Sequence, residues 1–161
     1  MAPWIPTENF QIKLPFFAES SSPDETFALG ERLAPFLEKG SIVALKGPLG
    51  AGKTCFVKGI AGGLGVQEVI TSATYTIISE YEAFLTGGEP IPVYHIDAYR
   101  LRGNDDFTAI GGEDIIFGKG ISIIEWSERI SDFIPPGTLK VDFEINTDGK
   151  RLICVYRMEN E

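Results

Sequence analysis

A glycine-rich loop placed directly after an apolar run is the feature that most limits how this chain can fold. Residues 47–54 read GPLGAGKT and follow the run IVAL at residues 42–45. They match the pattern G-x-x-x-x-G-K-[ST], in which glycines let backbone N–H groups turn inward around phosphates. Because such a loop works between a buried strand and a helix N-terminus, it predicts a strand at 41–46. It also predicts a helix from about residue 53 to 64 that breaks at the Gly62–Gly63 pair.

The last two residues of the motif indicate what the loop holds. Lys53 is predicted to reach the terminal phosphates of a nucleotide, and the Thr54 hydroxyl is predicted to bind Mg²⁺. GTPases read guanine through N-K-x-D and position a switch through D-x-x-G, and neither pattern occurs in this chain. The sequence therefore favours ATP.

Apolar and turn-forming residues alternate along the rest of the chain as they do in α/β proteins. Residues 22–25 (SPDE) match a capping box, so we expect a helix to begin there, to continue through the apolar spacing to Leu37 and to end at Gly40. A weaker helical pattern with glycine interruptions covers residues 104–117. The expected strands are residues 11–18, 41–46, 74–83, 91–99, 120–126, 138–146 and 151–158.

The order of these elements predicts one fold class. Turn residues join the strands at 74–83 and 91–99, and those at 138–146 and 151–158, so each pair is expected to form a hairpin. Pro15 indicates an edge position for the strand at 11–18. We therefore expect an α/β, P-loop NTPase-like three-layer domain with a mixed, partly parallel sheet, edge hairpins and flanking helices. Residues 1–161 are expected to form a single P-loop ATPase domain.

The charge balance limits the partners of the chain. Its net charge is −9, its pI is about 4.6, and its lysines and arginines are scattered. Because phosphate contacts dominate nucleic-acid affinity, autonomous DNA or RNA binding is not expected. The sequence has no apolar run long enough to span a bilayer and no secretory signal pattern. Cys55 and Cys154 form no C-x-x-C pair, so we expect a cytoplasmic protein with reduced thiols and no membrane association.

Two carboxylates follow apolar runs, where a phosphate-binding loop needs an acid to hold a metal or orient water. Glu125 follows ISII at residues 121–124, the position of an acid at the C-terminal end of a parallel strand. Asp97, within HIDAYR at 95–100, is the second candidate, although it could instead cap a turn or pair with a nearby arginine. His95 is the only histidine, so a zinc site is unsupported and a structural role is favoured.

Several motifs together resemble one known family. GPLGAGKT (47–54), SATYT (72–76), HIDAYRL (95–101) and EWSER (125–129) occur in the order and spacing of the TsaE family, also called YjeE. The segment ETFALGERLAPFL at 25–37 is similar as well, so the resemblance covers residues 20–130. HxDxYRL and EWxER are far more specific than the loop alone. Members of this family are small bacterial P-loop ATPases.

The resemblance implies a role in tRNA modification. The family acts in forming threonylcarbamoyladenosine beside the anticodon. TsaC-type enzymes make threonylcarbamoyl-adenylate, and TsaD with TsaB transfers the group to tRNA. TsaE binds that pair and hydrolyses ATP, slowly when alone, to permit repeated cycles. The implied cofactors are ATP and Mg²⁺, and the implied partners are TsaD and TsaB, with tRNA reached only through them.

The resemblance also implies roles for particular residues. Lys53, Asp97 and Glu125 would be catalytic, with Asp97 positioning water near the γ-phosphate. Thr54 and Glu125 would bind Mg²⁺ directly or through water. A switch or partner contact would involve Ser72, Thr74, Tyr75 and Trp126. The nucleotide would be bound by Glu25, Thr26, Leu49, Gly50, Ala51, Gly52, Lys53, Thr54 and Cys55, with Glu25 and Thr26 toward the base or ribose.

Three positions depart from the family pattern, and two other functions stay open. Ala73 replaces a usual proline, Pro48 a common acid, and Cys55 a common serine or threonine. None of these changes removes a ligand, but the loss of proline leaves the rigidity of the switch segment open. One alternative is a small-molecule kinase with residues 102–120 as a lid, although that segment has a single arginine. The other is a non-catalytic nucleotide-sensing adaptor.

Overall fold

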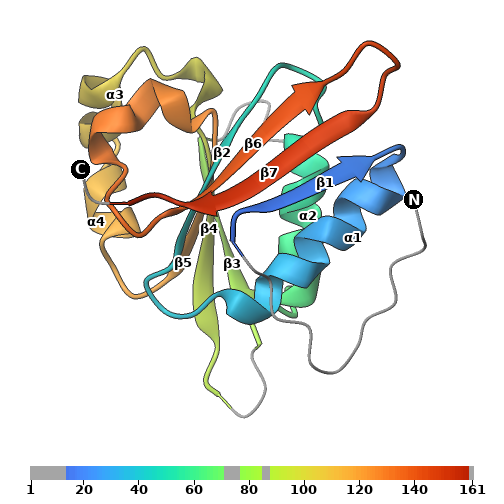
Figure 1. Ribbon diagram of the computed structural model, residues 1–161. Coiled ribbons are helices and arrows are strands. Elements are labelled where there is room, and N and C mark those ends of the chain that lie inside the picture. Colours follow the sequence, from blue (N-terminus) through green and yellow to red (C-terminus); the bar gives the residue numbers. More distant parts are fainter. Residues whose placement is uncertain (1–13, 71–76, 85–87, 160–161) are drawn as a thin grey trace.

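The computed structural model describes residues 14–70, 77–84 and 88–159. At its centre is a seven-stranded sheet with the order β1-β7-β6-β2-β5-β4-β3 (Figure 1). The strands are β1 (Phe16–Ser20), β2 (Ile42–Lys46), β3 (Ile78–Ala83), β4 (Ile91–Asp97), β5 (Ile121–Glu125), β6 (Leu139–Ile145) and β7 (Arg151–Arg157).

The four central strands are parallel and the outer strands are antiparallel. β2 pairs in parallel with both β5 and β6, and β5 pairs in parallel with β4. β3 and β7 add antiparallel to β4 and β6, and β1 adds antiparallel to β7. The predicted mixed sheet and both predicted hairpins are therefore confirmed. Because parallel strands end at the same edge, the C-terminal ends of β2, β4 and β5 meet there, with Leu45 and Asp97 both registered on Glu125.

Helices lie on both faces of the sheet, as predicted for a three-layer domain. α1 (Pro23–Leu33) and α2 (Lys53–Gly63) cover one face, where Val43 and Leu45 of β2 point. α3 (Asn104–Ala109), α4 (Gly112–Ile116) and the 3₁₀ helix η3 (Ser127–Phe133) cover part of the other, where Ile42 and Ala44 point. The described part of the chain contains no helix that is long and apolar enough to cross a membrane.

One predicted helix end is wrong and the other is confirmed. α1 begins as expected, with the Ser22 hydroxyl accepting from the Glu25 N–H, but it ends at Leu33 and does not continue through Leu37 to Gly40. Pro35 lacks the N–H that an α-helix would need there, so residues Ala34–Phe36 form the 3₁₀ turn η1 instead. α2 ends at Gly63, so the predicted break at the Gly62–Gly63 pair is confirmed, and a Cβ at Gly63 would also lie 2.6 Å from the Cβ of Ala34.

Other boundaries also differ from the prediction. β4 ends at Asp97, because the Asp97 carboxylate accepts from the Tyr99 N–H and starts the 3₁₀ turn η2 (Ala98–Arg100). Residues 104–117 form two short helices on either side of Gly111, whose φ is 77°. β1 starts at Phe16 and β3 at Ile78. The earlier residues of those two predicted strands, 11–13 and 74–76, lie outside the described residues.

α1 and α2 pack with their backbones in direct contact, and two glycines make this possible. A Cβ at Gly59 of α2 would lie 2.1 Å from the carbonyl oxygen of Phe27, and one at Gly30 of α1 would lie 2.3 Å from that of Phe56. A backbone oxygen cannot rotate away from such a clash. The crossing that anchors the helix after the glycine-rich loop therefore depends on the absence of side chains at these positions.

We expect Gly59→Ala to lower the free energy of unfolding by about 1–3 kcal/mol, since the new methyl group must displace the backbone of α1. Gly62→Ala in the same helix is the matched control, because its Cβ would meet only the tip of the Phe27 ring, at 3.3 Å. Urea unfolding monitored by circular dichroism measures the free energy of unfolding of both variants. An equal loss of stability in the two variants would contradict this account of the crossing.

Candidate nucleotide and metal site

The glycine-rich loop connects β2 to α2 at the C-terminal edge of the sheet, where the topology brings the functional side chains together. Gly50 and Gly52 have φ values of 78° and 98°, in the left-handed region that favours glycine. Gly47 is close to β6, where a Cβ would lie 2.7 Å from that of Phe143. The backbone thus needs glycine at each of these positions for a local reason, and α2 begins immediately after Gly52.

Lys53 lies at the base of the loop with its side chain folded back over it. The Nζ atom donates to the carbonyl oxygens of Gly47 and Pro48, at 2.6 and 2.9 Å, and lies 4.0 Å from the centroid of the Trp126 ring. Burial lowers the pKa of Lys53, whereas the carboxylates of Glu125, Glu128 and Asp97 oppose that change. The ammonium group is thus held against the loop by two of the loop's own carbonyl oxygens.

Glu125 is the centre of a buried polar chain below the loop. Its Oε1 atom accepts from the Thr54 hydroxyl at 2.9 Å, and its Oε2 atom lies 2.5 Å from Nε2 of His95. Both Glu125 and His95 are only 3% exposed. Since both carboxylate oxygens have partners, the side chain is held in one orientation, with one oxygen directed toward the first turn of α2.

His95 was predicted to be structural, but its contact with Glu125 was not foreseen, although its position offered a signal. In a strand, residues two apart share a face, so His95 and Asp97 both point to the same side of β4, next to β5. A hydrogen bond joins Nε2 of His95 to the Glu125 carboxyl group. The histidine is structural, as favoured above, but the group that it orients is the candidate metal ligand.

We expect His95→Leu to lower the free energy of unfolding by about 2 kcal/mol, because it leaves a buried carboxylate oxygen without its donor. His95→Gln is the control, since its amide can still donate to Glu125. Urea unfolding of the two variants checks this expectation. Equal stability of His95→Leu and the unmodified chain would show that the hydrogen bond contributes little.

Asp97 lies beside Glu125 at the end of the neighbouring strand. Burial raises the pKa of Asp97, and the nearby Glu125 carboxylate raises it further. The Tyr99 N–H, which donates to Oδ1 at 3.0 Å, and the positive groups of the site act in the opposite direction. The structure thus brings together Lys53, Thr54, Asp97 and Glu125 at one edge of the sheet.

Trp126 adjoins this group in a conformation that few non-glycine residues adopt. Its φ and ψ are 58° and 42°, in the left-handed region, directly after Glu125. Its ring contacts Lys53 on one side and packs on Tyr99, with the two ring centroids 4.9 Å apart. Tyr99 is half exposed, so the two rings form an aromatic wall beside the loop.

A hollow of about 180 Å³ lies on the other side of the loop. Thr26 lines it and is packed against the loop, since a Cβ at Gly52 would lie 3.3 Å from its methyl group. Cys55 also lines it and donates to the carbonyl of Pro23 at 3.1 Å, and burial raises the pKa of its thiol. Glu25 instead accepts from the Ser21 N–H at 2.7 Å, at the start of α1.

Arg151 borders the same hollow and was also missed. It comes from the first residue of β7, and its Nη2 atom donates to the carbonyl of Gly50 at 3.0 Å. The two residues are far apart in the chain, so no local pattern could connect them. Of the remaining predicted residues, Leu49 is exposed at the loop tip and Ala51 is buried. Ser72, Thr74 and Tyr75 lie outside the described residues.

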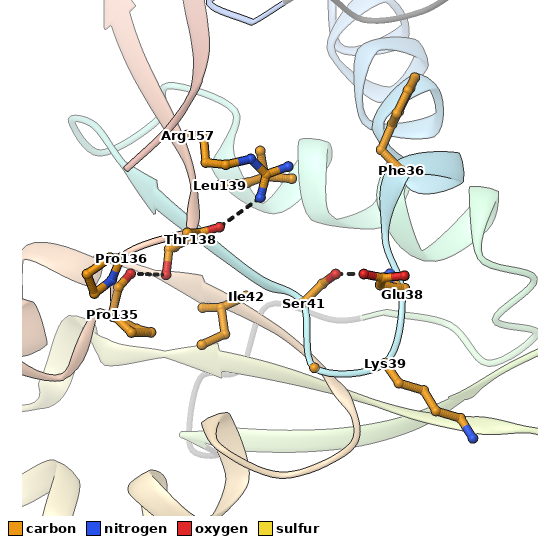
Figure 2. Close-up of a pocket in the computed structure, with 12 residues that line it drawn as sticks. Phe36, Glu38, Lys39, Ser41, Ile42, Pro135, Pro136, Thr138, Leu139 and Arg157 are labelled. Carbon is orange, nitrogen blue, oxygen red and sulfur yellow. Dashed lines mark hydrogen bonds between the residues drawn. The ribbon is translucent and has the colours of Figure 1, made fainter. Parts of the chain in front are cut away.

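A separate hollow of about 270 Å³ lies at the opposite edge of the sheet, at the start of β2 and β6 (Figure 2). The polar groups that line it form hydrogen bonds within the surrounding turns. Arg157 donates to the Gly137 carbonyl at 2.8 Å, the Thr138 hydroxyl donates to Pro135, and the Ser41 hydroxyl accepts from the Glu38 N–H. It is therefore remote from the loop and from the acidic residues described above.

The donor set below the loop fits a magnesium ion. Magnesium prefers oxygen ligands and is usually held by one or two protein oxygens together with phosphates and water. The Thr54 hydroxyl and the Glu125 carboxylate are two such oxygens, 2.9 Å apart. Within the described residues there is no cluster of three His, Cys, Asp or Glu that could hold a metal alone. The arrangement suits a metal that is shared with a phosphate.

Comparisons with known proteins show which family this chain resembles. A sequence model for the family described as "Threonylcarbamoyl adenosine biosynthesis protein TsaE" matches residues 20–153. The tRNA threonylcarbamoyladenosine biosynthesis protein TsaE of Treponema pallidum is 43% identical over 136 residues, which cover 84% of this chain and 96% of the relative. The protein of the same name from Bacillus subtilis is 36% identical over 139 residues, which cover 86% and 84%.

A solved structure is also similar to this chain. The crystal structure of Bacillus subtilis YdiB matches with a TM-score of 0.69 and 32% sequence identity, over 94% of this chain and 90% of that one. The two proteins share the P-loop NTPase-like fold. The resemblance to the TsaE family that the four sequence motifs indicated is therefore confirmed. The matched residues include the loop, Asp97, Glu125 and Arg151. The chain therefore belongs to the TsaE family of threonylcarbamoyl adenosine biosynthesis proteins.

Proposed function

We propose that this chain, as a single ATPase domain, binds and hydrolyses MgATP in the formation of threonylcarbamoyladenosine on tRNA. Membership of the TsaE family supports the pathway and implies the use of a nucleotide and a metal. The observation that carries the ATPase proposal is the Thr54–Glu125 hydrogen bond below a glycine-rich loop, with Asp97 registered beside it. This combination supplies a phosphate cradle, metal-binding oxygens and a further carboxylate in one place.

Each part of the site has a proposed role. The backbone N–H groups of Gly50, Ala51 and Gly52, at the N-terminus of α2, bind phosphate oxygens, and the Lys53 ammonium group binds the terminal phosphates. Thr54 and Glu125 hold Mg²⁺, which neutralises charge on the phosphates when bound. His95 keeps the Glu125 carboxylate in place for that purpose.

The hollow beside the loop is proposed to receive the ribose or base. Thr26 lies directly against the loop there, and Arg151 reaches Gly50 from β7. Glu25 is adjacent to Thr26 and is exposed. Leu49, at the loop tip, and Cys55, directly after the loop, are proposed to contact the bound nucleotide.

Asp97 is proposed to orient the attacking water. We expect Asp97→Asn to lower ATP turnover about 100-fold, because an amide cannot accept a proton as a carboxylate can. The affinity for ATP should change little, since the phosphate-binding groups remain. The amide oxygen can still accept from the Tyr99 N–H, which preserves the turn. Turnover is measured with partners present, and Asp105→Asn, at an exposed residue, is the control. Unchanged turnover in Asp97→Asn would show that Asp97 does not orient the attacking water.

TsaB and TsaD are the proposed partners, with tRNA contacted mainly through them. The net charge of −9 opposes direct binding of a polyanion, so the positive surface must come from other proteins. The deciding experiment is ATP hydrolysis by the purified chain alone, and then with TsaB, TsaD and tRNA. Stimulation by the partners supports the proposal. Slow hydrolysis that the partners leave unchanged would keep the ATP site but overturn the pathway role.

The two alternatives make different predictions. A kinase would transfer phosphate to a metabolite, and its lid would need a free arginine. The segment considered as a lid has a single arginine, Arg102 at its start, which disfavours that function. An adaptor would keep ATP binding without turnover in the unmodified chain. Measuring both metabolite phosphorylation and plain hydrolysis separates all three functions.

A further inference from the structure

The tip of the glycine-rich loop has little packing to hold its shape. Gly50 has a φ of 78°, and a Cβ built on it would lie within 4 Å of no atom of the described residues. The preceding residue, Leu49, is 76% exposed. Ala51 is buried, but the carbonyl group of Gly50 comes before it in the chain. The orientation of that carbonyl therefore depends on its hydrogen bonds and not on packed side chains.

A hydrogen bond to this carbonyl comes from a distant segment of the chain. Arg151, the first residue of β7, donates from Nη2 to the Gly50 carbonyl at 3.0 Å. Its Nη1 atom donates to the carbonyl of Gly149 at 2.6 Å, in the turn between β6 and β7. The guanidinium group is a planar fork whose N–H groups point in fixed directions. It therefore joins the loop to the β6–β7 hairpin as one rigid unit.

The hairpin turn gives this contact a fixed support. The Asn146 N–H donates to the Lys150 carbonyl at 2.9 Å, and the Gly149 N–H donates to the Asn146 carbonyl at 3.0 Å. Two side chains close the turn further, since Asn146 accepts from the Asp148 N–H and Asp148 accepts from the Lys150 N–H. The turn is thus held by its own hydrogen bonds, so the position of Arg151 does not depend on the loop.

The contact with Arg151 also determines where an N–H of the loop points. In a trans peptide the C=O and N–H bonds point in opposite directions, so a Gly50 carbonyl held toward Arg151 directs the Ala51 N–H away from it. That N–H donates to the Pro48 carbonyl at 3.2 Å, and the same carbonyl accepts from Nζ of Lys53 at 2.9 Å. The Ala51 N–H and the lysine ammonium group therefore face the same atom.

We propose that Arg151 is a positioning residue that holds the loop in its phosphate-binding shape. The inference rests on the proposed function, because it concerns how the same loop binds phosphate. Lys53 must release the loop carbonyls when its ammonium group binds phosphate. The bond from Arg151 to Gly50 need not break at that point, so it keeps the Ala51 N–H directed toward Lys53. Arg151 thus acts through the Gly50 peptide and not by contact with the nucleotide.

The first test measures the loop in the nucleotide-free chain. Hydrogen exchange of the Ala51 N–H is followed by NMR on the full ¹⁵N-labelled protein. We expect Arg151→Ala to speed this exchange about tenfold, because the peptide loses the bond that holds its carbonyl. Lys150→Ala is the matched control. It removes the same charge from the same turn, but Lys150 pairs with Glu19 of β1 at 2.9 Å. Equal exchange rates in the two variants would overturn the inference.

The second test measures ATP affinity by calorimetry on the same variants. We expect Arg151→Ala to raise the Kd about tenfold and Lys150→Ala to change it less than about twofold. Thermal unfolding of the nucleotide-free variants should be alike, which separates a loss of loop position from a loss of fold. Guanidinium chloride at about 10 mM should restore part of the affinity of Arg151→Ala, whereas ammonium chloride should not, because only the planar ion can bridge two carbonyls.

The outcomes separate this inference from the proposed function. If the unmodified chain does not bind ATP, the proposed function fails, and the role of Arg151 in it fails as well. If the unmodified chain binds ATP and the Kd values of Arg151→Ala and Lys150→Ala are equal, only the role of Arg151 is overturned. Weaker ATP binding with unchanged exchange of the Ala51 N–H would mean that Arg151 contacts the nucleotide directly, and would overturn the positioning role.

Discussion

Glu125→Ala is expected to lower ATP hydrolysis about 10³-fold while ATP binding is retained. Three facts about Glu125 lead to this expectation. It ends a parallel strand beside Asp97, its Oε1 atom accepts from the Thr54 hydroxyl, and His95 holds its Oε2 atom. Removing the carboxylate takes away a metal-binding oxygen and leaves both partners without their acceptor. The phosphate-binding backbone and Lys53 remain, so the nucleotide can still bind.

The measurement needs turnover and affinity on the same preparations. Turnover is assayed with partners present, and affinity is measured by calorimetry with ATP. Glu128→Ala is the matched control, because Glu128 is an exposed acid three residues further along the chain. Glu125→Gln keeps an oxygen for Thr54 and separates loss of charge from loss of fold. Turnover by Glu125→Ala equal to that of Glu128→Ala would remove Glu125 from the mechanism.

Local patterns were sufficient for the parts of the site that follow one another in the chain. The motif at 47–54 predicted the strand, the loop and the start of α2, because all three are consecutive. The apolar run before Glu125 predicted a buried strand, and its parallel pairing with β2 brings that acid below the loop. Strand alternation could also have identified His95, since it shares a face with Asp97.

Contacts between distant segments could not be predicted in the same way. Arg151 reaches Gly50 only because β7 lies next to β6 and β6 lies next to β2. The glycine pair was predicted to end α2 and does so, but no local pattern showed that Gly59, earlier in the helix, permits the close crossing with α1. Propensity alone cannot distinguish a glycine that ends a helix from one that permits a close crossing.

The resting position of Lys53 explains why one side chain should control affinity. Its ammonium group donates to two carbonyls of the loop and lies over the Trp126 ring, so it is held at the mouth of the phosphate cradle. Both carbonyls belong to the loop itself, and each is a neutral acceptor. Phosphate oxygens carry charge and accept more strongly, so they can replace these partners without any large movement of the backbone.

We therefore expect Lys53→Ala to weaken ATP binding by about 2–3 kcal/mol, which corresponds to roughly 30- to 150-fold in Kd. Calorimetry with ATP measures it, and Lys58→Ala, an exposed lysine on the same helix, is the control. Lys53 is only 5% exposed, so thermal unfolding must show that the variant is folded, and Lys53→Gln provides a second variant that can still donate to the loop carbonyls. If folded Lys53→Ala binds ATP as tightly as Lys58→Ala, the loop does not bind phosphate through this lysine.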